Sequence, residues 1–187
     1  MSSRETYKPG PARGAEVRKD EDNWTLVLVR ELRHAPTKVW QALTDPTQLR
    51  EWAPFDADRS LASVGPVKLS TVGTATPVVS ETTVTRADPP ALLEYKWGDN
   101  QMRWELEPFG GGTRLTLWHN IDRRYISMGA AGWHICFDVL DHLLAGEPLG
   151  RIVAGAAMQF EWPRLNSEYA KQFGVEARQP PPTVSRT

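Results

Sequence analysis

The sequence lacks most of the features that mark specialised classes of protein. It holds a single cysteine, Cys136, which excludes an intrachain disulfide and any zinc-finger spacing. No apolar run approaches the roughly 20 residues that a transmembrane helix requires, and the first residues have no apolar segment of the kind found in signal peptides. The formal net charge of −1 at pH 7 provides no basic field for nucleic acid. We therefore expect a cytoplasmic protein with no membrane span and no nucleic-acid partner.

Tryptophan, in contrast, is abundant, with 8 residues in a chain of 187. Large aromatic side chains bury much area, so their first use is to fill a core. Some of them can instead line a pocket for an apolar or aromatic ligand. The length suits one domain of ordinary size with tails, and both explanations of the tryptophans stay open at this point.

Composition divides the chain into four segments. Residues 1–22 mix proline, glycine and charges with few large apolar residues, which predicts a tail. Residues 23–146 carry the regular hydrophobic patterns of a folded domain. Residues 147–175 form an extension, in which an irregular connection leads to a helix over 161–173 that packs on the domain. Residues 176–187 contain three consecutive prolines, which predict an extended tail.

The domain is predicted to begin with a strand that is followed by two short helices. Residues 24–32 are rich in β-branched and apolar side chains, which favour a strand. Pro36 suits the first position of a helix over 36–44, because the N–H that proline lacks is not used there. Asp45 and Pro46 repeat this signal as the N-cap and the first residue of a second helix.

The rest of the domain has the pattern of a β-meander and one long helix. Alternating apolar and polar residues predict strands joined by short turns, over residues 67–72, 78–87, 92–97, 102–107 and 114–121. Short turns imply antiparallel pairing with one face in solvent. Between Gly132 and Gly146 apolar residues recur at three- and four-residue spacing, which is typical of an amphipathic helix. We therefore predict an α+β fold in which a curved antiparallel sheet wraps around this helix.

This order of elements resembles the START-like superfamily, whose fold is called the helix-grip fold. The resemblance is greatest to the branch named for homologues of the activator of Hsp90 ATPase, which is grouped with polyketide cyclases. It rests on Ala35-Pro36, Val39-Trp40, Thr44-Asp45-Pro46, Leu49 with Trp52, Asp88-Pro89-Pro90, the G-G-G-T-R-L-T-L segment from Gly110, and G-W-H-I-C-F-D-V-L from Gly132. The resemblance implies a deep cavity between the sheet and the long helix, which in that superfamily holds small apolar or aromatic molecules. Its members include lipid carriers, cyclases and chaperone regulators.

The apolar faces of the sheet and the helix supply the expected walls of such a cavity. These walls are Tyr95, Trp97, Trp104, Leu117 and His119 on the sheet, with Trp133, Cys136, Phe137 and Leu140 on the helix. Binding of a small hydrophobic or aromatic ligand between them is the first functional prediction. The alternatives are a cyclase or dehydratase that uses this cavity, and regulation of a chaperone or another partner protein through the surface. A homodimer also stays open.

His119 is the polar residue with the clearest functional interpretation, because it lies between Leu117 and Ile121 on an apolar strand face. One interpretation is a core histidine whose ring is hydrogen-bonded inside the protein. The other is a polar group in the cavity, which orients a ligand or, in an enzyme, acts as general acid or base. His119 is therefore the candidate catalytic residue of the enzyme hypothesis.

Other chemistry is less well supported by the sequence. His134 and Asp138 share a helix face, but a third ligand and the H-E-x-x-H pattern are missing, so we expect no metal ion. Cys136 lies on the buried stripe and is expected to act as a small apolar residue. Arg30 either points inward toward a carboxylate ligand or reaches the rim. Phosphate-binding and dinucleotide-binding glycine patterns are absent, so we expect no cofactor.

Overall fold

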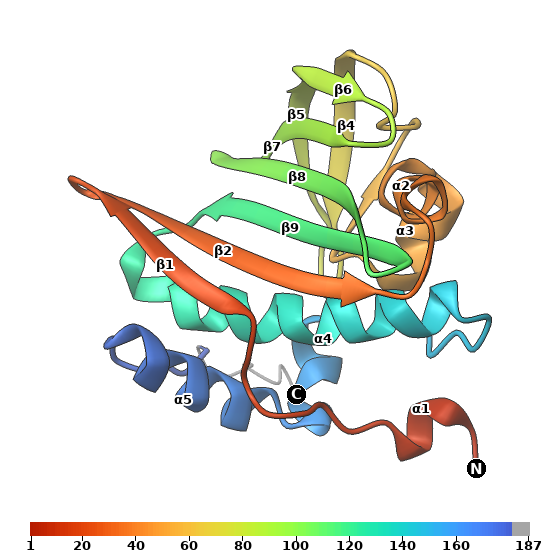
Figure 1. Cartoon of the computed structure of the whole chain (residues 1–187). Coiled ribbons are helices and arrows are strands. Elements are labelled where there is room, and N and C mark those ends of the chain that lie inside the picture. Colours follow the sequence, from red (N-terminus) through yellow and green to blue (C-terminus); the bar gives the residue numbers. More distant parts are fainter. Residues whose placement is uncertain (181–187) are drawn as a thin grey trace.

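The structure, a computed structural model, describes residues 1–180 and has the predicted α+β architecture. Its main sheet is antiparallel and curved, with the strand order β1-β2-β9-β8-β7-β6, and a smaller sheet has the order β3-β4-β5. Figure 1 shows three layers, in which the long helix α4 lies between the main sheet and a layer formed by α5, η2 and the amino-terminal segment. The domain is therefore a sheet gripping a helix that is also covered on its other side.

The elements have the following bounds. The strands are β1 (Ala15–Asp20), β2 (Asn23–Leu32), β3 (Phe55–Ala57), β4 (Gly65–Thr71), β5 (Val78–Val84), β6 (Arg86–Asp88), β7 (Leu92–Trp97), β8 (Asn100–Phe109) and β9 (Gly112–Asn120). The helices are α1 (Ser3–Thr6), α2 (Pro36–Thr44), α3 (Pro46–Trp52), α4 (Ile126–Leu144) and α5 (Trp162–Phe173), with 3-10 turns η1 (Arg123–Tyr125) and η2 (Ala154–Phe160). In the part of the chain that is described, no helix is long and apolar enough to cross a bilayer.

The two short helices form as the sequence predicts. Pro36 and Pro46 occupy the first turns of α2 and α3, and the Asp45 carboxylate caps α3 by accepting from the Thr47 N–H at 2.8 Å. The Trp52 indole donates to the Ala42 carbonyl at 2.9 Å, which fixes one helix against the other. The pair closes one end of the sheet (Figure 1).

The β-meander is confirmed, and its register places the predicted apolar residues on one face. Met102 pairs with His119 and Trp104 pairs with Leu117 across β8 and β9, and all four side chains are buried. Tyr95 on β7 pairs with Met102 and continues the same face. The predicted strand over 78–87 is in fact two, because β5 belongs to the small sheet and β6 to the main one.

The long helix is longer than predicted, since α4 starts at Ile126 rather than near Gly132. Its first turns carry small residues, which weaken the amphipathic signal from which the sequence prediction was made. Packing explains why residue 129 is a glycine, because a Cβ there would lie 2.6 Å from the Ile121 side chain. The small residues let β9 and the start of α4 approach closely.

The prediction of a tail over residues 1–22 is wrong for residues 15–20. Residues 15–20 form the edge strand β1, which pairs antiparallel with β2. Only one face of this strand touches the protein, and most of its side chains are charged and exposed. Its composition therefore resembles that of a tail. Arg4 donates to the carbonyls of Leu149, Gly150 and Arg151 at 3.0–3.1 Å, which holds the segment before β1 against the extension.

The carboxy-terminal extension packs on α4 through α5. The buried Ser127 hydroxyl donates to Asn166 Oδ1 at 2.7 Å, which joins α4 to α5. The same Asn166 amide donates to the Arg178 carbonyl at 2.8 Å, so residues after α5 also return to the domain. The predicted proline-rich tail begins within the described residues, without regular structure up to Pro180, and its remainder, residues 181–187, lies outside them.

Candidate ligand-binding site

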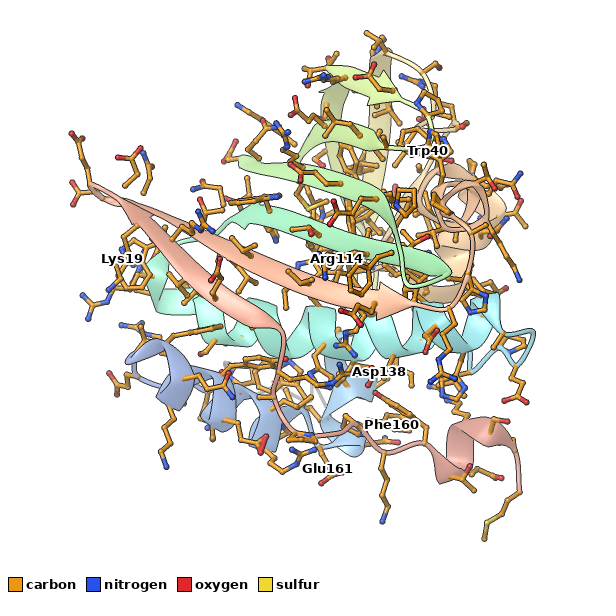
Figure 2. The ribbon with its side chains drawn as sticks, in the orientation of Figure 1. Lys19, Trp40, Arg114, Asp138, Phe160 and Glu161 are labelled. Atoms are coloured by element: carbon orange, nitrogen blue, oxygen red, sulfur yellow. The ribbon has the colours of Figure 1, made fainter. Side chains whose placement is uncertain are left out.

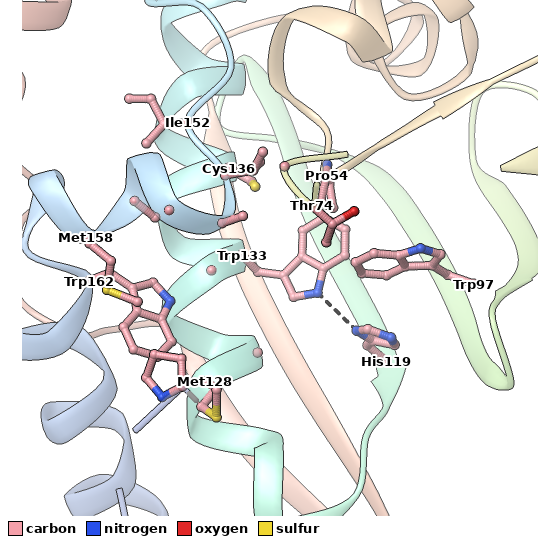
Figure 3. A pocket seen from close by; sticks show the side chains of 18 of the residues that line it. Pro54, Thr74, Trp97, His119, Met128, Trp133, Cys136, Ile152, Met158 and Trp162 are labelled. Carbon is pink, nitrogen blue, oxygen red and sulfur yellow. Dashed lines mark hydrogen bonds between the residues drawn. The ribbon is translucent and has the colours of Figure 1, made fainter. Parts of the chain in front are cut away.

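A cavity of about 650 Å³ lies beside the first half of α4. The main sheet supplies Trp97 and His119, and the helix supplies one wall from Met128 to Cys136. The opposite wall comes from the extension and from the turn between β4 and β5, with Gly73, Thr74, Ala75, Ile152, Ala154, Met158 and Trp162. Figure 3 shows Met158 and Trp162 on one side of this space and Trp97 on the other. The cavity is therefore enclosed by both the core domain and the extension.

Four of the nine predicted wall residues line this cavity, namely Trp97, His119, Trp133 and Cys136. The other five are buried in the core instead, and they are Tyr95, Trp104, Leu117, Phe137 and Leu140.

Aromatic rings close the middle of the sheet–helix interface. Trp104 lies edge-on to Trp52 and to Trp133, with ring centroids 6.1 Å and 5.5 Å away, and its ring centroid is 6.0 Å from that of Phe137. The Trp104 indole donates to the Tyr95 hydroxyl at 3.1 Å, which satisfies both polar groups inside the core. Within residues 1–180, open space between the sheet and the helix thus lies only toward one end of the helix.

Glycine on α4 keeps that end open. A Cβ added at Gly132 would meet no atom within 4 Å, although Gly132 sits on the cavity wall between Met128 and Cys136. Glycine inside a helix is unfavourable by about 1 kcal/mol relative to alanine. The helix therefore carries a residue with low helix propensity at a place where a side chain would occupy the cavity.

His119 is held at the cavity wall by two tryptophans. The Trp133 indole N–H donates to His119 Nδ1 at 3.0 Å (Figure 3), and the Trp97 ring stacks on the imidazole with centroids 5.9 Å apart. Because Nδ1 accepts, the proton of the neutral ring lies on Nε2. His119 Nε2 is buried and has no hydrogen-bond partner among the described residues. The site thus presents one unused N–H donor.

Burial keeps the imidazole uncharged. His119 is only 3% exposed, and this desolvation lowers its pKa from 6.5 to about 3. The ring is therefore neutral at physiological pH. Burial also raises the pKa of the Cys136 thiol to about 12, so this cysteine is a protonated wall residue and not a nucleophile.

A second polar cluster lies on α4 away from the cavity. Arg30 Nη1 donates to Asp138 Oδ1 at 2.8 Å, and the Tyr7 hydroxyl donates to Oδ2 at 2.6 Å. His134 Nε2 lies 3.5 Å from the same carboxylate, as their four-residue spacing predicted, and its Nδ1 lies 2.6 Å from the Tyr169 hydroxyl. Figure 2 shows Asp138 on the side of α4 toward the amino-terminal segment.

This cluster fastens the outer layer and does not line the cavity. Arg30 pairs with a protein carboxylate, so the prediction that it could bind a carboxylate ligand is not supported by its position. Burial lowers the pKa of His134 to about 4 and raises that of Tyr7. In residues 1–180 no group of three or more His, Cys, Asp or Glu side chains is placed to hold a metal ion.

No sequence pattern indicated the part of the cavity wall that comes from outside the sheet and the long helix. Ile152, Met158 and Trp162 come from the extension, and Gly73 from the turn between β4 and β5. Ile152 and Met158 lie outside the predicted helices and strands, where side chains follow no periodicity, and the helical pattern that includes Trp162 indicates a packed face but not a cavity. The abundance of tryptophan was the one available signal.

Comparison with known proteins places this geometry in a family. The sequence matches the family described as Activator of Hsp90 ATPase homolog 1-like protein over residues 33–145, more than half of its 187 residues. The chain belongs to this family. The match includes His119 and Trp133 and stops before the extension, so the Hsp90-activator-like core carries the donor, while the part of the opposite wall that the extension supplies lies beyond it. No curated protein matches the sequence.

Solved structures share the fold. CalU16 from Micromonospora echinospora, in its solution structure, has a TM-score of 0.65 at 18% identity, and the match covers 89% of this chain and 94% of that one. A conserved protein of unknown function from Enterococcus faecalis has a TM-score of 0.64 at 13% identity, with 84% and 89% covered. An AHSA1-like protein from Aeromonas hydrophila has a TM-score of 0.55 at 16% identity, with 65% and 92% covered. At these identities the likeness establishes the helix-grip fold.

Proposed function

We propose that this member of the Hsp90-activator-like family binds a small hydrophobic or aromatic molecule in the cavity beside α4. The observation that carries the proposal is His119, a neutral imidazole whose Nε2–H is buried at the wall of a mainly apolar cavity and has no partner among the described residues. A buried donor without a partner costs about 1–3 kcal/mol. A ligand with an acceptor atom at this position would remove that cost.

The dimensions of the cavity support the proposal. Its volume of about 650 Å³ falls within the range of roughly 300–1,000 Å³ that is usual for small-molecule sites. Trp97, Trp133 and Trp162 offer flat apolar surface to an aromatic ring. A ligand that buries about 300 Å² of apolar surface gains about 7 kcal/mol before the cost of association is subtracted.

The state of His119 supports hydrogen bonding to a ligand better than proton transfer. Its Nδ1 already accepts from Trp133, and loss of the Nε2 proton would leave an imidazolate. Its pKa of about 3 also makes the ring a weak base near neutral pH. The cyclase or dehydratase alternative therefore gains no support from this geometry, and regulation of a partner protein stays a prediction.

The cavity can be tested with 6-propionyl-2-(dimethylamino)naphthalene, a neutral aryl ketone whose fluorescence reports the polarity around it. We expect saturable 1:1 binding with a blue shift. Gly132→Phe should weaken binding by roughly tenfold or more, because the new ring enters the cavity from α4. Gly132→Ala is the matched control, since it also replaces the glycine but adds only a methyl group.

The donor can be tested with a pair of ligands that differ in one acceptor. We expect 2-acetylnaphthalene to bind about tenfold more tightly than 2-ethylnaphthalene to the natural chain, and equally to His119→Phe. The readout is the ratio of the two dissociation constants measured on the same protein. A general loss of stability in the variant affects both constants alike and leaves their ratio unchanged. Absence of saturable binding, or equal binding to Gly132→Phe and Gly132→Ala, would contradict the proposal.

A further inference from the structure

A second cavity, of about 400 Å³, adjoins the first. The two share five wall residues, namely Trp97, His119, Met128, Gly129 and Trp162. They therefore meet around His119, and a ligand that reaches its Nε2–H from the first cavity lies at the entrance to the second.

The second cavity differs from the first in its polar groups. Thr71, Ser80 and Asn100 line it in addition to the shared residues. The Ser80 Oγ is buried and has no hydrogen-bond partner in the part of the chain that the structure describes. The Thr71 hydroxyl, in contrast, already accepts from the Trp97 indole at 2.9 Å. Two unused polar atoms, His119 Nε2 and Ser80 Oγ, thus lie on the wall of this one small cavity.

Charge is missing from both cavities. Within residues 1–180, no Asp, Glu, Lys or Arg lines either of them. An ionised carboxylate or ammonium group that is buried without a partner costs several kcal/mol. The walls of these cavities therefore favour an uncharged ligand.

From these observations, and building on the proposed function, we infer that the ligand is an uncharged molecule in two parts. Its aromatic or polycyclic body occupies the first cavity, and a carbonyl or similar acceptor next to that body bonds His119 Nε2–H. A short neutral arm that ends in a hydroxyl or amide group enters the second cavity and bonds Ser80 Oγ. The two unused polar atoms are then both satisfied by one ligand.

A series of 2-naphthamides tests this arrangement, because the aryl carbonyl is constant and only the arm on nitrogen changes. The N-methyl amide has no polar arm, the N-(2-hydroxyethyl) and N-(3-hydroxypropyl) amides have neutral arms of two lengths, and the N-(2-carboxyethyl) amide has an anionic one. We expect the better of the two hydroxyl compounds to bind about fivefold more tightly than the N-methyl amide, as one added hydrogen bond predicts. The anionic compound should bind more weakly than either of the two hydroxyl compounds.

Substitution of Ser80 identifies the contact. In Ser80→Ala the advantage of the hydroxyl arm should disappear, while the affinity for the N-methyl amide stays within about twofold of the natural chain. Thr83→Ala is the control, because Thr83 is an exposed hydroxyl on the same strand that lines neither cavity. Affinities can be measured by displacement of the naphthyl ketone probe and by calorimetry.

The possible outcomes separate this inference from the proposed function. If no naphthamide binds saturably, the proposed function fails, and this inference fails with it. If the N-methyl amide binds but a hydroxyl arm adds nothing, or adds the same amount in Ser80→Ala, the second cavity is not an arm site although the first cavity is a binding site. Tighter binding of the anionic compound would overturn the assignment of an uncharged ligand.

Discussion

The buried imidazole of His119 should make folding stability depend on pH in a way that can be isolated by mutation. Its pKa is 6.5 when unperturbed and about 3 in the folded protein, because burial disfavours the charged ring. Below pH 6.5 the unfolded chain therefore binds a proton that the folded chain does not. The contribution of His119 is complete above pH 6.5 and is lost as the pH falls toward 3.

The magnitude follows from the size of this difference. Each pH unit below 6.5 removes about 1.4 kcal/mol from the free energy of unfolding. The loss between pH 6.5 and pH 5 is therefore about 2 kcal/mol. Burial also lowers the pKa of His134 to about 4, so His134 adds to the loss of stability at low pH. This loss is the same in proteins that differ only at residue 119, so it cancels in the comparison.

Urea unfolding at pH 7 and pH 5, followed by circular dichroism, measures this contribution. In His119→Gln the amide oxygen can still accept from the Trp133 indole, but no titrating group remains at this position. We expect the natural chain to lose about 2 kcal/mol more than His119→Gln between the two pH values. His142→Gln, which changes a half-buried residue near the end of α4, is the control. An identical pH dependence in the natural chain and in His119→Gln would refute the assignment of a neutral, desolvated imidazole.

Two further substitutions test the outer layer and the cavity rim. Asp138→Asn should lower the free energy of unfolding by about 3–5 kcal/mol in thermal or urea melts, because it leaves the buried Arg30 without its counter-charge. The exposed pair of Glu16 with Arg18 is the control, and Glu16→Gln should cost less than about 1 kcal/mol; similar losses in both variants would contradict the role of burial. Gly73→Ala should destabilise the protein and weaken probe binding, because its Cβ would lie 2.6 Å from the Cβ of Ala154. Adding Ala154→Gly should restore probe binding but only part of the stability, because it removes the facing Cβ while alanine at residue 73 stays strained at a φ of 89°; no gain in binding from the second substitution would mean that the contact does not shape the cavity.

The fold could be predicted well because its signals are local. Pro36, Asp45 and Pro46 act within one helical turn, and the alternation over 92–97 gives the bounds of β7 as they are found. The strand β1 could not be predicted, because an edge strand needs apolar residues on only one face and Val17 is its only large one. Its position depends on pairing with β2, which a local pattern does not contain.

The candidate site was predicted only in part, for a different reason. Alternation and helical spacing correctly predicted that Trp104 and Phe137 point into the interface, but they do not tell whether facing rings touch. In the structure those two rings pack against each other, whereas His119 and Trp133 border open space. The difference depends on neighbours distant in sequence, such as Trp52 in the filled part.

The division of the cavity between the family core and the extension has a consequence for how ligand preference diverges. His119 and Trp133 lie in the region that matches the family, whereas Met158 and Trp162 lie after it. Substitutions in the extension can therefore change the facing wall of the cavity while His119 and Trp133 stay in place. In this chain the variable side of the cavity is thus encoded largely after residue 145, outside the part that defines its family.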